Sequence, residues 1–204
     1  MPLLESSFSV LALWAVIGYL LGSIPFGMVL AKVMNLGNLR EVGSGNIGAT
    51  NVLRTGNKTA AALTLLLDAG KGAAAFLLAW GLTGAEDAAQ IAGLAAMFGH
   101  CYPVWLKFNG GKGVATFLGL MLALSLPVGA ACCAAWVVGA GVSRISSMGA
   151  LVAAASSTFF MAFLGLPQAL VLGVILTLLI FWRHRGNIAR IRAGTEPRIG
   201  KKSQ

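Results

Sequence analysis

The stretch from residue 43 to residue 54 combines glycines with neutral and charged hydrogen-bond donors. Glycine-rich backbone lets successive N–H groups converge on an anion, and Arg54 adds a planar guanidinium that suits phosphate. Gly43, Gly45 and Gly48 formally match the dinucleotide fingerprint, but that motif follows a strand, and here an apolar membrane stretch comes first. We therefore predict phosphate binding without a nucleotide fold; a flexible surface loop is the alternative. The candidate residues are Gly43, Ser44, Gly45, Asn46, Thr50, Asn51 and Arg54.

A second donor-rich segment opens an expected helix with Gly110-Gly111-Lys112-Gly113. It is not a Walker A loop, because Leu106 stands where that motif requires glycine and Gly113 stands where it requires serine or threonine. Free N–H groups at a helix N-terminus, together with a lysine, still form an anion site. Lys112 is therefore a candidate phosphate ligand, and an ordinary basic membrane anchor is the alternative.

A third segment follows the last apolar stretch and contains His184 and Asn187. Residues three apart share one face of a helix, so these side chains are candidates for a joint role; for His184 alone, an idle interfacial histidine is the alternative. Asp68 and Lys71 have the same spacing inside an apolar stretch, where charges are costly and usually paired. We favour a structural pair there, with direct ligand contact as the alternative.

The sequence excludes several common chemistries. Six acidic residues are too few for the clustered carboxylates of a metal-dependent lipid phosphotransferase, so we predict no metal site. Neither His100 nor His184 is followed five residues later by aspartate, as in histidine-base glycerolipid acyltransferases, and a Gly-x-Ser-x-Gly serine hydrolase elbow is absent. A site rich in anion donors and poor in bases remains, where substrate phosphates supply charge and catalysis rests on positioning and electrostatics.

Composition places these segments in a membrane protein. Of the 204 residues, 57% are hydrophobic and 10% are charged, with a mean hydropathy of +0.83, whereas soluble domains carry about 25% charged residues. Such a chain cannot surround itself with polar surface, so its solvent is lipid. We expect a single domain over residues 1–204, without a cleavable signal peptide, because the N-terminus has no basic start. The three cysteines indicate neither a disulfide framework nor a metal site.

Apolar stretches predict an all-α integral membrane fold with about seven transmembrane helices; six is the alternative, because some stretches are short. With the residues after Trp182 in the cytoplasm, every lysine and arginine except Lys32 and Lys71 falls in a cytoplasmic segment. This asymmetry follows the positive-inside rule, with the N-terminus outside and the C-terminus in the cytoplasm. Nucleic acid is not an expected partner, because the basic residues lie at membrane ends. The stretches cover about residues 8–34, 59–82, 88–106, 114–125, 128–142, 148–164 and 169–182.

At its donor-rich segments the sequence resembles a known family, the bacterial acyl-phosphate-dependent glycerol-3-phosphate acyltransferases of the PlsY type. GSGNIGATNVLR resembles the first motif of that family, GHCYPVWLKFNGGKGVAT the second and RHRGNIARIRAGTEP the third. Asp68, Lys71 and Gly72 match its D-x-x-K-G element. The motifs occur in the family order and the resemblance covers nearly the whole chain.

The resemblance implies a seven-span enzyme of the bacterial inner membrane, with its active site facing the cytoplasm. The enzyme would acylate the 1-hydroxyl of glycerol 3-phosphate from acyl phosphate, giving lysophosphatidic acid and inorganic phosphate. It would need no cofactor and no metal, and we expect a monomer whose other partners are membrane lipids. By resemblance, Gly110, Gly111 and Gly113 shape the glycerol phosphate site, Ser147 contacts phosphate and Glu196 is structural. The implied catalytic set is Ser44, Arg54, Lys112, His184 and Asn187.

Three questions stay open at the level of sequence. The segment Ser143-Arg144-Ile145-Ser146-Ser147 departs from the Thr-Arg-Tyr pattern of the family, so Ser146 is an alternative to Ser147, and these hydroxyls could also be helix caps. The general base is either a substrate phosphate or His184. The alternative function is a transporter for an organic phosphate, which predicts broken helices near the bilayer midplane and often internal repeats.

Overall fold

The computed structural model describes residues 2–200, and every regular element in that range is helical. Short 3₁₀ turns occupy Leu53–Thr55, Val104–Leu106 and Pro167–Ala169. The helices are α1 (Phe8–Gly22), α2 (Phe26–Val33), α3 (Ala49–Val52), α4 (Lys58–Thr83), α5 (Glu86–Cys101), α6 (Val114–Leu124), α7 (Leu126–Ser143), α8 (Ser146–Phe163), α9 (Leu170–Arg183) and α10 (Arg185–Arg192).

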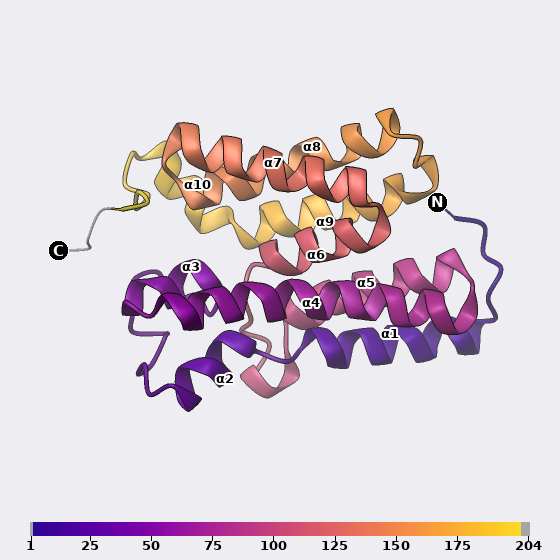
Figure 1. Cartoon of the computed structure of the whole chain (residues 1–204), viewed down its shortest axis with the longest axis horizontal. Coiled ribbons are helices and arrows are strands. Elements are labelled where there is room, and N and C mark those ends of the chain that lie inside the picture. The colour runs from indigo at the N-terminus through magenta and orange to yellow at the C-terminus, as the bar shows by residue number, and fades with distance from the viewer. Residues whose placement is uncertain (1, 201–204) are drawn as a thin grey trace.

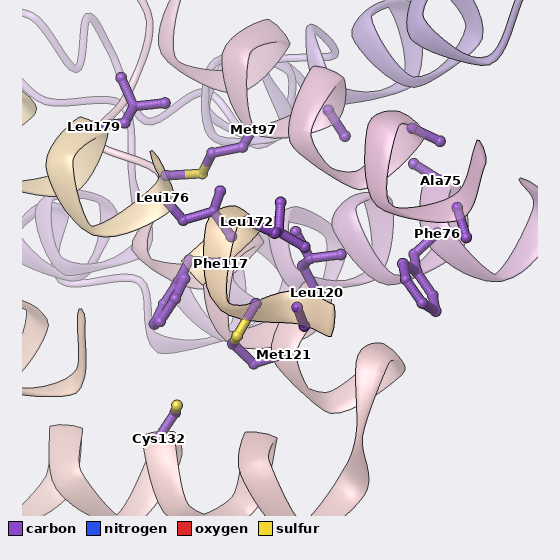
Figure 2. Packing of buried hydrophobic residues seen from close by; sticks show 14 of the residues in the cluster. Ala75, Phe76, Met97, Phe117, Leu120, Met121, Cys132, Leu172, Leu176 and Leu179 are labelled. Carbon is purple, nitrogen blue, oxygen red and sulfur yellow. The ribbon is translucent and has the colours of Figure 1, made fainter. Parts of the chain in front are cut away.

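The long helices form two layers with α6 between them (Figure 1). One layer contains α1, α4 and α5, and the other contains α7, α8 and α9. Helix α6 packs against α4 on one side and α7 on the other, so it joins the layers. The core between them is apolar and includes Met97, Phe117 and Leu176, all fully buried (Figure 2).

Glycines bring α4 and α6 close together. A Cβ atom on Gly72 of α4 would lie 2.5 Å from the backbone oxygen of Thr116, and one on Gly119 of α6 would lie 2.0 Å from the backbone oxygen of Ala69. Only glycine fits at such distances, as in other membrane helix contacts where backbones approach closely. The abundance of glycine inside the apolar stretches is therefore partly explained by packing between α4 and α6.

Each predicted apolar stretch is mainly helical, although the stretch 8–34 is divided into α1 and α2. The helices differ in their capacity to cross a membrane. Four segments are long and apolar enough by themselves, namely Phe8–Val33, Lys58–Thr83, Leu126–Ser143 and Ser146–Phe163. A fifth is added if Pro167–Arg183 and Arg185–Arg192, which meet at a bend of 61°, count as one span. Helix α5 has 16 residues and α6 has 11, and both fall short of this length. The seven-span arrangement and the orientation of the termini thus stay predictions.

The three donor-rich segments lie at one end of the bundle. Helices α2, α3 and α10 occupy the same end in Figure 1, together with the C-terminal part of the chain, whereas the N-terminus lies at the other end. Helix α4 begins there after its N-cap residue Asn57, whose side chain accepts a hydrogen bond from the Ala60 N–H at 2.9 Å. At the far end α4 stops at Gly84, which has a φ of +66°. The fold therefore gathers segments that are far apart in sequence at one face.

Candidate functional site

A cavity of about 640 Å³ lies where the three donor-rich segments meet. Most of the predicted site residues line it; the exceptions are Gly45, Gly110 and Gly111. One part of the lining is polar, and another is apolar and comes from α4, α6, α7 and α8. The predicted residues in the lining are Gly43, Ser44, Asn46, Thr50, Asn51, Arg54, Lys112, Gly113, Ser147, His184 and Asn187. The apolar lining includes Leu65, Val114, Leu118, Trp136, Val137 and Ala150.

Asn51 holds the first segment in shape. Its side-chain oxygen accepts hydrogen bonds from the Ser44 N–H at 3.1 Å and from Arg54 at 3.4 Å. Its side-chain nitrogen donates to the backbone oxygens of Leu39 and Asn46 at 3.0 and 2.7 Å, so both amide donors are used within the protein. Asn51 is 1% exposed. It therefore acts as a scaffold for the loop rather than as the open donor that its residue type suggested.

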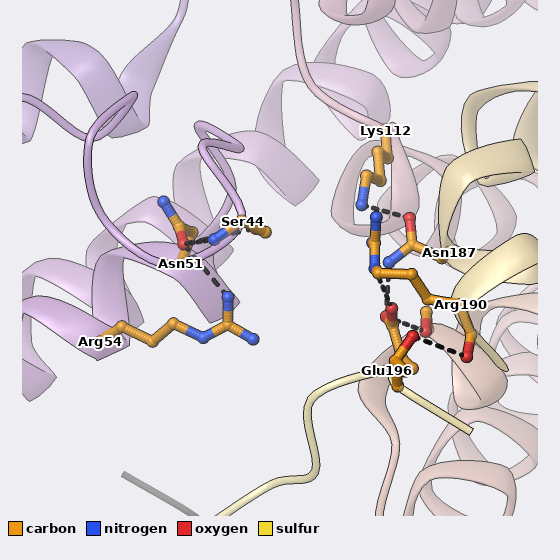
Figure 3. Close-up of polar contacts among 9 residues, drawn as sticks. Ser44, Asn51, Arg54, Lys112, Asn187, Arg190 and Glu196 are labelled. Carbon is orange, nitrogen blue, oxygen red and sulfur yellow. Dashed lines mark hydrogen bonds and ion pairs between the residues drawn. The ribbon is translucent and has the colours of Figure 1, made fainter. Parts of the chain in front are cut away.

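Arg54 lies along the same loop and faces the cavity. A Cβ atom on Gly43, which has a φ of +51°, would lie 2.6 Å from Cδ of Arg54, so glycine is required for this contact. Figure 3 shows the guanidinium on the side of the loop that faces Lys112 and Glu196. The first segment thus presents one positive charge to the cavity, as the sequence predicts.

The second segment reverses direction before α6 through residues with left-handed backbone. Lys107, Phe108 and Gly113 have φ values of 49°, 61° and 82°, and the turn leaves Lys112 pointing into the cavity. Its ammonium group donates a hydrogen bond to Oδ1 of Asn187 at 2.5 Å. The fold therefore joins the second and third segments directly.

Gly110 and Gly111 have a packing role in this structure. A Cβ on Gly110 would lie 2.1 Å from the backbone oxygen of His100, and one on Gly111 would lie 2.2 Å from Nε2 of that histidine. Arg183 donates to both glycine carbonyl oxygens, at 3.1 and 3.0 Å, and stacks over the ring of Tyr102. These two glycines let the Lys112 loop lie directly on the end of α5 and do not line the cavity.

Glu196 organises the third segment. Its Oε1 accepts hydrogen bonds from Ser147 at 2.7 Å and from Nδ2 of Asn187 at 2.5 Å, and its Oε2 accepts one from Nε of Arg190 at 2.7 Å. The next residues return to the α7–α8 turn, where the Ile199 N–H donates to the backbone oxygen of Arg144 at 2.7 Å. This arrangement, shown in part in Figure 3, is consistent with the structural role implied for Glu196.

Burial and the surrounding polar groups shift the pKa values of Lys112 and Glu196 at this wall. Burial lowers the pKa of Lys112 to about 8, against the opposing attraction of Glu196, and the nearby arginines lower it further. Burial alone would raise the pKa of Glu196, but its hydrogen bonds from Asn187, Ser147 and Arg190 outweigh burial and hold it below its usual range. Glu196 is therefore ionised at neutral pH, while Lys112 can exchange its proton near physiological pH.

Ser146 and Ser147 both line the cavity, with different partners. Ser147 donates to Glu196, whereas the Ser146 hydroxyl lies 3.2 Å from that of Thr50 and links α8 to the first segment. Neither serine caps α8, because the N-cap residue is Ile145 and no side chain bonds there. Both serines that the sequence offered as the phosphate-contacting residue therefore lie at the site.

Asp68 and Lys71 form the buried pair predicted by their spacing, with 2.7 Å between Oδ1 and Nζ. Lys71 also donates to the backbone oxygen of Ile24 at 2.8 Å, in the break between α1 and α2. Asp68 lines the cavity as well, and Nδ1 of His100 lies 3.7 Å from its Oδ1. The pairing predicted from the spacing is confirmed, and Asp68 is also part of the cavity lining.

Sequence reasoning missed several residues at the site. Arg190 lines the cavity beside Glu196, and His100 lines it beneath Gly111. Arg40 connects two segments, because its guanidinium donates to the Gly45 oxygen at 3.1 Å and also to the backbone oxygen of Asn109. His100 and Arg190 lie within the motif segments, and this position could have indicated that they belong to the site. Nothing in the spacing of Arg40 indicated its partners.

Comparison with known proteins shows the family of this chain. The family model for glycerol-3-phosphate acyltransferase matches residues 12–194. The glycerol-3-phosphate acyltransferase of Roseobacter denitrificans is 70% identical over 98% of this chain and 100% of its own length, and that of Ruegeria pomeroyi is 67% identical over the full length of both.

Solved structures give the same result. The glycerol 3-phosphate form of PlsY, an integral membrane glycerol 3-phosphate acyltransferase, is 39% identical with a TM-score of 0.88, covering 93% of this chain and 96% of that one. Its lysophosphatidic acid form is 37% identical with a TM-score of 0.85, covering 93% and 95%. This chain belongs to the glycerol-3-phosphate acyltransferase family of integral membrane enzymes.

Proposed function

We propose that this acyltransferase uses an acyl phosphate as donor and transfers its acyl group to the 1-hydroxyl of glycerol 3-phosphate, giving lysophosphatidic acid and inorganic phosphate. The observation that carries the proposal is the two-part cavity, with donors from three segments in one part and apolar side chains in the other. An acyl phosphate has the same two parts, a phosphate and a hydrocarbon chain. Membership of the acyltransferase family sets the transporter alternative aside.

The residues divide by position in the cavity. Arg54 and Ser44 bind the phosphate of the donor, because they line one wall of the cavity and Arg54 gives that wall a positive charge. Lys112, Asn187 and His184 form another part of the lining and bind glycerol 3-phosphate. Arg54 and Lys112 each place a positive charge on the lining of a largely buried site, where electrostatic interactions with phosphate are stronger than in water.

In the reaction, the 1-hydroxyl oxygen forms a bond to the acyl carbon, and the bond between that carbon and the phosphate oxygen breaks. Inorganic phosphate leaves, and the hydroxyl proton passes to a phosphate oxygen of a substrate. Glu196 is a poor base, because both of its oxygens already accept hydrogen bonds. Nδ1 of His184 lies 2.8 Å from the Ile180 backbone oxygen, an arrangement that orients the ring. Positioning and charge stabilisation therefore carry most of the catalysis.

We also propose a seven-span topology with the site at the cytoplasmic face of the bacterial inner membrane. The polar part of the cavity lies at the end of the bundle that holds α3, α10 and most of the basic residues, and basic residues remain on the cytoplasmic side. The acyl donor then reaches its apolar part sideways from the bilayer, and glycerol 3-phosphate arrives from the cytosol.

The test is an assay on purified protein in detergent. Glycerol 3-phosphate is supplied with palmitoyl phosphate or with palmitoyl-CoA, and both phosphate release and lysophosphatidic acid are followed, with Lys112→Ala as the control. We expect turnover only with palmitoyl phosphate, lost in the variant. Turnover with palmitoyl-CoA alone would overturn the donor assignment, and no turnover with either donor from folded protein would contradict the proposed reaction.

A further inference from the structure

Glycerol 3-phosphate presents two kinds of group to a binding site. Its phosphate accepts hydrogen bonds, whereas its two hydroxyls donate them. The residues assigned to it above are mostly donors, which suits the phosphate, but a buried hydroxyl without an acceptor is costly. This inference rests on the proposed function. It concerns which side chain in the cavity accepts a hydrogen bond from the hydroxyl of glycerol 3-phosphate that does not react.

Among the described residues that line the cavity, two are carboxylates, Asp68 and Glu196. Both oxygens of Glu196 are engaged by Ser147, Asn187 and Arg190. Asp68 differs, because only its Oδ1 is engaged, by Lys71. Its Oδ2 has no hydrogen-bond partner within residues 2–200. Asp68 is therefore the carboxylate with spare capacity to accept.

Asp68 also shares the cavity lining with the phosphate-binding Lys112. His100, whose Nδ1 is 3.7 Å from Oδ1 of Asp68, lies directly beneath Gly111, the neighbour of Lys112. Nδ1 of His100 is buried and has no hydrogen-bond partner. The His100 ring thus connects Asp68 to the loop that carries Lys112, and both side chains line the same cavity.

A contribution to the stability of the fold does not by itself explain why a carboxylate occupies position 68. Asp68 is 2% exposed and Lys71 is 5% exposed, and replacing a buried ion pair by apolar side chains of similar volume is often neutral or stabilising. Charged residues inside membrane helices therefore commonly mark functional sites. Lys71 neutralises the carboxylate and holds it in place, with its own anchor on the Ile24 backbone oxygen.

We propose that Asp68 accepts a hydrogen bond from the 2-hydroxyl of glycerol 3-phosphate and thereby selects this acceptor. The 1-hydroxyl cannot be the group in question, because it must face the acyl carbon and give up its proton. The 2-hydroxyl keeps its proton throughout, so an ionised acceptor can hold it in the ground state and in the transition state. Phosphate on Lys112 and the 2-hydroxyl on Asp68 fix two points of the substrate and leave the 1-hydroxyl free to react.

The test compares glycerol 3-phosphate with 3-hydroxypropyl phosphate, which keeps the phosphate and the reactive hydroxyl but lacks the 2-hydroxyl. We expect the wild-type enzyme to prefer glycerol 3-phosphate by about 10–100-fold in kcat/KM, the range for a hydrogen bond to a charged group. We expect Asp68→Asn to lower this preference. The double variant Asp68→Leu with Lys71→Met, which removes both charges together, should abolish it. Both variants retain turnover of 3-hydroxypropyl phosphate, whereas a purely structural role of Asp68 would lower turnover of both substrates equally.

Two further variants keep the test decisive. Asp87→Asn changes another buried carboxylate, which accepts from the Glu5 and Ser6 N–H groups at the far end of the bundle, and should leave the preference unchanged. Asn46→Ala removes one of the rival neutral acceptors in the lining; an unchanged preference in this variant is expected and excludes Asn46 as the partner of the 2-hydroxyl. A wild-type preference below about twofold, far under the value of one such bond, overturns the inference, as does loss of preference in Asn46→Ala. In either case turnover with acyl phosphate leaves the proposed reaction standing.

Discussion

Lys112 and Glu196 are connected through a single amide, that of Asn187. Its oxygen accepts a hydrogen bond from Lys112 and its nitrogen donates one to Glu196, both at 2.5 Å. An amide is suited to this position, because it offers an acceptor to the cation and a donor to the anion. The charge of Glu196 is thus kept from pairing directly with Lys112, which leaves the ammonium group available to a phosphate.

Asn187→Asp tests this arrangement. The new carboxylate still accepts from Lys112, but it places a second negative charge against Oε1 of Glu196 and competes with phosphate for the lysine. We expect kcat/KM for glycerol 3-phosphate to fall by about 100-fold or more, because a like charge directly at a binding group costs several kcal/mol. Steady-state kinetics measure the loss. Asn38→Ala, at an exposed contact with Glu41, is the matched control, and an Asn187→Asp enzyme of normal kcat/KM would contradict the arrangement.

The lowered pKa of Lys112 predicts an alkaline limb in the activity profile. The protonated lysine binds phosphate, so kcat/KM should fall as the pH rises through about 8, the pKa in the free enzyme. Lys112→Arg removes this limb, because a guanidinium stays charged at that pH, although the activity at pH 7 is lower. A limb near 8 that persists in the arginine variant would assign it to another group.

The same shift has a defined effect on folding. The pKa of Lys112 is lower in the folded protein than the ordinary value of 10.5, so the unfolded chain binds more protons between about pH 8 and pH 10.5. The contribution of this group to the free energy of unfolding therefore rises with pH in that window. Lys112→Met should remove this rise, which chemical denaturation in detergent at several pH values can measure.

His184→Gln tests which group takes the proton. If a substrate phosphate is the base, the glutamine variant should retain turnover within about tenfold of wild type, whereas loss of a true general base costs about 100- to 10,000-fold. Single-turnover measurements at saturating glycerol 3-phosphate isolate this step from binding. A loss beyond 100-fold from folded protein would instead make His184 the base.

Two glycines of α4 form a matched pair for helix packing. A Cβ on Gly72 would lie 2.5 Å from the Thr116 backbone oxygen, whereas one on Gly70 would meet nothing within 4 Å. We expect Gly72→Ala to lower the free energy of unfolding by about 1–3 kcal/mol through overpacking, and Gly70→Ala to leave it unchanged or slightly raised. Thermal unfolding of the two purified variants gives the comparison, and equal stabilities would refute the close contact between α4 and α6.

Much of the fold could be predicted from apolar periodicity, because lipid-facing helices leave long runs of apolar residues in the sequence. The break at residues 23–25 was not predicted, since both halves are apolar. Its backbone oxygens at Ser23 and Ile24 accept hydrogen bonds from Trp105 and Lys71, which are distant in the sequence. At the site, Lys112 and Arg54 face the cavity as their residue types suggest. Asn51 does not act as an open donor, because its partners are backbone oxygens that no side-chain pattern records.

The hydrogen bond between Ile199 and Arg144 has a consequence for how the enzyme is made. Thr195, Glu196 and Pro197 form part of the cavity wall, so the site is incomplete until these residues have left the ribosome and folded back against the α7–α8 turn. All the helices that cross or enter the bilayer precede them in the chain. Insertion into the membrane is therefore finished before catalysis can begin, and a chain cut short before residue 195 would be an inserted but inactive protein.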